Sequence, residues 1–110
     1  MTARDGTMLD RLHATLASRG EADPETSYTA KLLRAGPERA AQKLGEEALE
    51  TALAAASGRR ERVVGESADL LYHLLVLWIA TGVTPAEVWE ELARREGRSG
   101  LAEKAQRPKS

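Results

Sequence analysis

The chain has 110 residues and a mass of 11.9 kDa, which is enough for one domain and too short for two ordinary ones. Hydrophobic residues make up 42% of it and charged residues 30%, a balance typical of a folded soluble protein rather than a disordered tail. The formal net charge of −1 excludes a global attraction to nucleic acid or to an anionic membrane. Because the sequence holds no cysteine, disulfides and thiolate metal sites are also excluded.

Helical spacing of apolar residues, with clear breaks between segments, predicts five helices. Pro37 lies in the first turn of the third helix, where proline is favoured, and Gly58 and Gly82 are the expected stops of the third and fourth helices. The fifth helix has a capping-box pattern in Thr84 and Glu87, with Pro85 at the first helical position. The expected helices are, in chain order, about 7–18, 28–34, 37–57, 60–81 and 85–96.

No alternating strand pattern extends over more than a few residues, so the expected fold class is all-α. We expect a single domain over 1–110, built as a small bundle of four to five helices, with 97–110 as a polar, loosely ordered tail. Segment 70–80 reads LLYHLLVLWIA and is apolar almost all round. A small bundle cannot surround such a helix alone, so we expect oligomerisation to complete the fold, most simply as a homodimer.

The same apolar segment bears on the location of the protein. It is shorter than the ~20 residues that span a bilayer, and it contains a histidine. The first residues, MTARDGTMLD, lack the apolar run of a secretory signal. We therefore expect a cytoplasmic protein with no membrane and no nucleic-acid partner.

Three glutamates, Glu46, Glu47 and Glu50, lie within five positions of the alanine-rich third helix. At ~100° per residue these acids form one stripe, and the alanines and leucines around them form another. A solvated acidic face would give the same pattern. The mid-helix Gly45 costs about 1 kcal/mol relative to alanine, which indicates close approach by another backbone or by a ligand.

The fourth helix carries a second acidic pair in line with a histidine. Glu66, Asp69 and His73 are three and four residues apart, so they share one face of the helix. That face continues into Val76 and Leu77, which indicates that the acids point toward the interior. Buried carboxylates must be protonated, paired or bound to metal. We expect His73 to be buried beside the acids rather than to serve as a ligand.

Acidic pairs on two neighbouring helices can bring four carboxylates to one point, and that much negative charge requires a cation. All-oxygen ligation suits Mg²⁺, with Mn²⁺ as a substitute and water in the remaining positions. A di-iron site calls for Glu-x-x-His, and neither Glu47 nor Glu66 has a histidine three residues later. The pattern therefore predicts a magnesium site, which indicates a phosphate-bearing substrate.

The acidic motifs and the words around them resemble a known family. ExxE at 47–50 and ExxD at 66–69 resemble the signature of the all-α, MazG-like nucleotide pyrophosphohydrolases. SYTAKLL at 27–33, KLGEEALE at 43–50 and ESADLLYHLLVLW at 66–78 are together similar to the phosphoribosyl-ATP pyrophosphohydrolases of histidine biosynthesis. The resemblance extends from about Met8 to Arg107, and one departure is Ser67, where the family more often has alanine.

This resemblance implies Mg²⁺-dependent hydrolysis of phosphoribosyl-ATP to phosphoribosyl-AMP and pyrophosphate, the second step of histidine biosynthesis. Glu46, beside the ligand stripe, is our candidate either for a residue that supports the ligands without binding the ion or for the general base, with Glu47 as competitor. The implied metal ligands are Glu47, Glu50, Glu66 and Asp69. The candidate phosphate-binding residues are Lys31 and Lys43, together with Arg94, Arg95 and Arg98, the arginines acting from a second subunit or remaining simply solvated.

Two other functions fit part of the sequence. The first is a house-cleaning MazG-type pyrophosphohydrolase that acts on free nucleoside triphosphates with the same acids. SYTAKLL at 27–33 and the GRSGLAEKAQR tail favour the histidine-pathway enzyme over it. The second is a non-catalytic helical oligomerisation module, in which the acidic residues would tolerate replacement by alanine.

Overall fold

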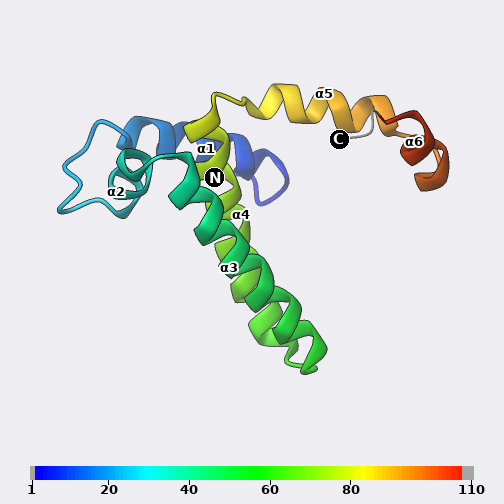
Figure 1. Cartoon of the computed structure of the whole chain (residues 1–110), viewed down its shortest axis with the longest axis horizontal. Coiled ribbons are helices and arrows are strands. Elements are labelled where there is room, and N and C mark those ends of the chain that lie inside the picture. Colours follow the sequence, from blue (N-terminus) through cyan, green and yellow to red (C-terminus); the bar gives the residue numbers. More distant parts are fainter. Residues whose placement is uncertain (1, 108–110) are drawn as a thin grey trace.

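The computed structural model describes residues 2–107 (Figure 1). This part of the chain contains six helices, joined by loops, and no strand. The all-α class expected from the sequence is therefore confirmed. The helices are α1 (Thr7–Arg19), α2 (Tyr28–Ala35), α3 (Pro37–Ala56), α4 (Arg60–Thr81), α5 (Pro85–Arg95) and α6 (Gly100–Gln106).

The two longest helices, α3 and α4, form an antiparallel hairpin that projects from the rest of the chain (Figure 1). Gly58 lies in the tight connection between them with a φ of +70°, a left-handed conformation that favours glycine. Gly82, at the end of α4, has the same left-handed conformation, with a φ of +76°. The sequence predicted a helix stop at both glycines, and both are confirmed.

The buried core lies where α1 and α2 pack against the base of the hairpin. Beyond this junction the hairpin buries little, and the most apolar 18-residue window of α4 is 17% buried. The radius of gyration is 15.8 Å, whereas a compact chain of this length would have about 13 Å. The core residues are Leu16, Leu32, Ala40, Leu75 and Val76.

Within the described part of the chain, α4 is the one helix whose length and composition would allow it to cross a membrane, with a mean hydropathy of 1.4 over that window. The core helix of a soluble protein passes the same test, so the feature is weak evidence of a span. Glu66, Asp69 and His73 also lie along this helix, and ionisable groups are costly in the centre of a bilayer.

The fifth helix begins with the capping box that the sequence predicted. The hydroxyl of Thr84 accepts from the backbone N–H of Glu87 at 3.3 Å, and the Glu87 carboxylate accepts from the backbone N–H of Thr84 at 3.1 Å. Trp89 anchors α5 to α1 and α4, because its indole N–H donates to Asp10 of α1 at 3.0 Å and its ring meets that of Trp78 of α4 edge to face. Beyond this anchor α5 leads away from the hairpin (Figure 1).

The segment 97–110, expected as a loosely ordered tail, contains a helix that the sequence did not predict. Ser99 caps this helix, α6, because its hydroxyl accepts from the backbone N–H of Ala102 at 3.1 Å. The two glycines of GRSG favoured a loop and obscured the serine cap between them. Residues 108–110 of the expected tail lie outside the described residues.

Candidate active site

Three carboxylates from α3 and α4 meet on one side of the hairpin. Oxygen atoms of Glu47, Glu66 and Asp69 all lie within 4.8 Å of one another. The antiparallel pairing sets the middle of α3 against the middle of α4, where Glu66 and Asp69 share a face at a spacing of three. Three of the four acids expected to converge are thus brought together, and we call them the carboxylate cluster.

The carboxylate cluster is only partly compensated by other groups. Oε2 of Glu47 and Oε2 of Glu66 are both buried and have no hydrogen-bond partner among the described residues. On the other side of Glu66, Arg62 approaches its Oε1 at 3.6 Å, and the Arg62 side chain is largely exposed. A buried carboxylate oxygen without a partner is unfavourable, so the chemistry of the cluster calls for a further cation.

Thr51 fixes the register of the two helices at the cluster. Its hydroxyl lies 2.7 Å from the backbone carbonyl oxygen of Glu47 and 3.2 Å from that of Glu66. One hydroxyl proton can satisfy one carbonyl at a time, so Thr51 alternates between the helices or shares its proton. Either way, it holds α3 and α4 side by side where their acids meet.

Glu50, the fourth expected ligand, is placed differently. Its side chain is exposed and does not belong to the carboxylate cluster. Three residues correspond to ~300° of rotation, so Glu50 lies ~60° round the helix from Glu47 and nearly a turn closer to the tip. There it lines a small hollow of about 160 Å³ together with Arg62 and Ser57.

Glu46, which directly precedes Glu47, forms an ion pair with Lys43, which lies one turn before Glu47 on the side nearer to α2. The Lys43 ammonium donates to Glu46 Oε2 at 3.0 Å. This hydrogen bond holds the pKa of Glu46 below its usual range and raises the pKa of Lys43. Both groups are therefore charged at neutral pH, and the ammonium group of Lys43 lies beside the acids of α3.

His73 connects the cluster to α2. It is buried, and its Nδ1–H donates to the backbone carbonyl oxygen of Asp69 at 2.8 Å. In a neutral ring, a proton on Nδ1 leaves Nε2 to accept from the Tyr28 hydroxyl, which lies 3.1 Å away. Tyr72 completes this group, with its hydroxyl 2.5 Å from the hydroxyl of the buried Thr29.

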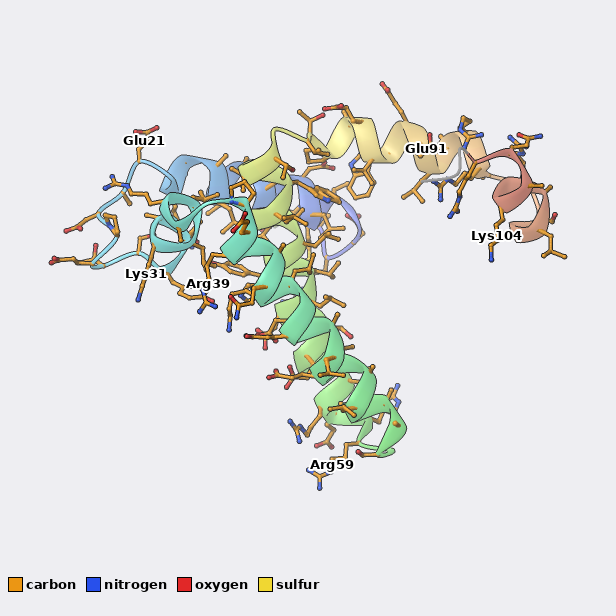
Figure 2. The ribbon with its side chains drawn as sticks, viewed as in Figure 1. Glu21, Lys31, Arg39, Arg59, Glu91 and Lys104 are labelled. Atoms are coloured by element: carbon orange, nitrogen blue, oxygen red, sulfur yellow. The ribbon has the colours of Figure 1, made fainter. Side chains whose placement is uncertain are left out.

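The remaining basic candidates lie farther from the cluster. Figure 2 shows Lys31 pointing away from α2 into solvent. Arg94 and Arg95 lie at the end of α5, where both donate to Glu91, at 2.6 Å and 3.1 Å. Figure 2 places Glu91 well apart from the hairpin, so within one chain these arginines are not brought to the acids.

Thr51, Arg62 and Tyr28 border this region although no acidic motif pointed to them. A threonine four residues after an acid, in an otherwise alanine-rich helix, is a signal that could have singled out Thr51. Arg62 stands one turn before Glu66, a spacing that favours ion pairs. Tyr28 belongs to SYTAKLL at 27–33, but the sequence left open whether it is a core aromatic or a substrate contact, because this depends on how α2 packs against α4.

Comparison with known proteins supports the resemblance seen in the sequence. A family model described as phosphoribosyl-ATP pyrophosphohydrolase matches residues 9–96. The phosphoribosyl-ATP pyrophosphatase of Azospirillum brasilense is 60% identical over 97 residues, which are 88% of this chain and 87% of that protein. The protein of the same name from Paramagnetospirillum magneticum is 56% identical over 107 residues, 97% of this chain and 98% of its own.

A third relative, the phosphoribosyl-ATP pyrophosphatase of Parvibaculum lavamentivorans, is 60% identical over 105 residues and covers 96% of both chains. These matches span nearly the whole chain, and the residues matched by the family model include all three members of the carboxylate cluster. The chain therefore belongs to the phosphoribosyl-ATP pyrophosphohydrolase family.

Proposed function

We propose that the protein hydrolyses phosphoribosyl-ATP to phosphoribosyl-AMP and pyrophosphate, the second step of histidine biosynthesis. Its relatives are named for this activity. The observation that carries the proposal is the carboxylate cluster, in which Glu47 and Glu66 each keep a buried oxygen atom without a partner. Such an arrangement is unfavourable unless a cation binds there, and a divalent cation is what a polyphosphate needs.

The donor set fits a hard divalent cation, Mg²⁺ first and Mn²⁺ as a substitute, because every donor is a carboxylate oxygen. Glu47, Glu66 and Asp69 would hold the ion, and Glu50 would join them by turning its exposed side chain toward the cluster. When bound, the ion supplies charge neutralisation to the phosphates and lowers the pKa of a bound water.

Lys43 and Glu46 have complementary roles in this proposal. The substrate brings phosphate oxygens that compete with Glu46 for the Lys43 ammonium. When Lys43 turns to the phosphates, Glu46 loses the hydrogen bond that lowers its pKa, and its carboxylate becomes a better acceptor for the proton of the attacking water. Lys31 would meet a phosphate at the α2 end of the site, whereas Arg94 and Arg95 would have to come from a second subunit.

We also propose that the protein is a homodimer, with the second copy covering the hairpin. Large apolar side chains remain exposed there, and two such hairpins can associate as a four-helix bundle. A Cβ added at Gly45 or at Gly65 would meet no atom within 4 Å, so nothing in the described chain accounts for a glycine inside either helix. Close approach of a partner helix accounts for both. The exposed apolar side chains are Leu49, Leu53, Val64 and Leu71.

Light scattering coupled to size-exclusion chromatography tests the dimer. We expect a dimeric mass for the wild type and a monomeric mass for Leu53→Glu, because a charge would be placed at the shared face. Leu101→Glu is the matched control, since Leu101 is 83% exposed on α6 and its replacement should leave the mass unchanged. A monomeric wild type would contradict the proposal.

We place the protein in the cytoplasm, as suits an enzyme of nucleotide and amino-acid metabolism. In this setting α4 is the central helix of the dimer, and its apolar surface faces the partner rather than lipid. Fractionation of expressing cells checks this, because a membrane-spanning α4 would leave the protein in the membrane pellet.

The proposed reaction is tested by a coupled assay for pyrophosphate release from phosphoribosyl-ATP, with Mg²⁺ and with excess chelator. We expect turnover that requires the divalent ion. A parallel panel of nucleoside triphosphates separates the house-cleaning alternative, since preference for dCTP or another free nucleotide would overturn the assignment. Absence of turnover on every nucleotide would instead favour the non-catalytic module.

A further inference from the structure

Tyr28, at the α2 end of the site, has an exposed side chain that is nevertheless held in place by neighbouring residues. Tyr28 is 49% exposed, yet its hydroxyl is held by His73 at 3.1 Å. Its ring stacks on that of Tyr72, with centroids 6.2 Å apart and planes inclined by 18°, and meets the His73 ring edge on at 5.9 Å. The exposed part of the ring is therefore fixed in place before any ligand arrives.

The backbone around Tyr28 is fixed as well. Ser27 caps α2, because its hydroxyl accepts from the Ala30 N–H at 3.2 Å, and its own N–H donates to the Asp23 carbonyl oxygen at 2.9 Å. Tyr28 is the first residue of α2, so the cap sets where its side chain leaves the backbone. A rigid aromatic surface binds a flat ligand with little further loss of conformational entropy.

The position of Tyr28 follows from the antiparallel hairpin. His73 lies one turn beyond Asp69 on α4, and Lys43 lies one turn before Glu47 on α3, so both are on the α2 side of the carboxylate cluster. One helical turn is ~5.4 Å, and the Tyr28 hydroxyl is bonded to His73 at that level. A nucleotide whose phosphates lie at the cluster can therefore place its sugar and base on the side where Tyr28 lies.

Open space adjoins the exposed part of the ring. A hollow of about 570 Å³ is lined by Tyr28, Lys31 and the loop from Pro24 to Ser27, and a second, of about 340 Å³, reaches from Tyr28 to Arg19 and Tyr72. Both volumes are in the range of sites for small molecules. The first hollow has an exposed lysine at its edge, which suits a phosphate carried on the far side of a base.

We propose that Tyr28 is the stacking platform for the purine base of the substrate, with Lys31 positioned for a phosphate beyond that base. This inference rests on the proposed function for the identity of the substrate. Every purine has a π-face, so stacking supplies affinity, and Lys31 adds selectivity for a base that bears a second phosphorylated group. The platform differs from the carboxylate cluster, which would act on the phosphates alone, through the divalent ion that it holds.

Paired substitutions separate the ring from the hydroxyl. Tyr28→Leu removes the π-face, whereas Tyr28→Phe keeps it and loses the bond to His73. Loss of one base–aromatic stack corresponds to a weakening of about tenfold, so we expect the KM of the leucine variant for phosphoribosyl-ATP to exceed that of the phenylalanine variant by about this factor. The two kcat values should differ much less. Equal KM values in the two variants would overturn the inference.

Two further measurements exclude an indirect effect. Pyrophosphate has no base, so its inhibition constant should be the same for the leucine variant and the wild type; a parallel rise would show that the substitution acts through the metal site. Equilibrium dialysis with AMP in the presence of EDTA reports base binding without metal or turnover, and the leucine variant should bind about tenfold more weakly. Equal AMP binding contradicts the platform, whereas inactivity of the wild type on phosphoribosyl-ATP contradicts only the proposed function.

Discussion

Replacing Glu47 by glutamine should stabilise the protein without metal and destabilise it with metal. The carboxylate of Glu47 keeps Oε2 buried without a partner and has oxygen atoms of Glu66 and Asp69 within 4.8 Å. Glutamine has nearly the same shape and no charge. The substitution therefore removes like-charge repulsion while leaving the packing of α3 against α4 in place.

The size of the effect follows from Coulomb's law. Two unit charges 4.8 Å apart repel by about 3.5 kcal/mol at an effective dielectric constant of about 20, and by about 0.9 kcal/mol in bulk water. Asp69 is exposed, so its contribution lies near the lower figure, and Arg62 offsets part of the charge of Glu66. We expect the metal-free variant to gain about 1–3 kcal/mol in free energy of unfolding.

Urea denaturation at one fixed protein concentration, in EDTA and in excess Mn²⁺, measures the effect of the substitution on the free energy of unfolding without and with metal. At a metal concentration one thousand times its dissociation constant, the wild type should gain about 4.1 kcal/mol in free energy of unfolding, and the variant much less, so their order of stability should invert. Glu46→Gln is the matched control: Glu46 is paired with Lys43, so it should show no gain in EDTA. A Glu47→Gln variant less stable than wild type in EDTA would refute the reasoning.

Three further predictions concern other parts of the chain. Glu46→Gln should lower kcat by about a hundredfold or more with little change in the calorimetric affinity for Mn²⁺; unchanged turnover would remove Glu46 from the chemistry. Hydrogen bonds from Arg94 and then from Arg95 lower the pKa of Glu91 from 4.5 to about 2. A pKa that is lower in the folded than in the unfolded chain stabilises the fold at pH values above the pKa of the unfolded chain. This contribution disappears as the pH falls from about 4.5 to about 2. Glu91→Gln should therefore reduce the urea midpoint at pH 7 and match the wild type near pH 2, and a difference that persists in acid would contradict the assignment. Thr84→Ala should cost about 1 kcal/mol in thermal or urea unfolding, because it removes the capping box of α5; no loss would mean that the start of α5 contributes nothing to the cooperative unit.

The helices were predictable because their signals are local. The capping box at Thr84 and the glycine stops at Gly58 and Gly82 each depend on a few neighbouring residues, and the structure has them where they were expected. The helix α6 was missed because Gly97 and Gly100 flank its serine cap. Local signals thus conflicted there, and the sequence offered no means of choosing between them.

The arrangement of the acids was predictable in part. Spacings of three and four fix which residues share a helix face, and this was enough to expect Glu66 and Asp69 opposite the acids of α3. Spacing places Glu50 ~60° round α3 from Glu47, but it does not fix how α3 is rotated against α4, so it could not foresee that Glu50 would lie outside the cluster. Nor could it foresee Tyr28 beside His73, because that contact depends on the packing of α2 against α4.

The basic residues show the same limit more strongly. Lys43 was expected near the acids, and its ion pair with Glu46 follows from their spacing on one helix. Arg94 and Arg95 were candidates for the substrate phosphates or for simple solvation, and within one chain α5 leads away from the hairpin (Figure 1). Only the second subunit of the proposed dimer would bring them to the acids. No pattern within one chain encodes that geometry.

The most direct test of the account is the position of a bound divalent ion. Crystals of the protein soaked in Mn²⁺ should show an anomalous peak about 2 Å from carboxylate oxygens of Glu47, Glu66 and Asp69, and the peak should be lost in Glu47→Gln. A peak at some other group of residues, or none at these carboxylates at saturating Mn²⁺, would contradict the claim that this cluster is the metal centre of the enzyme.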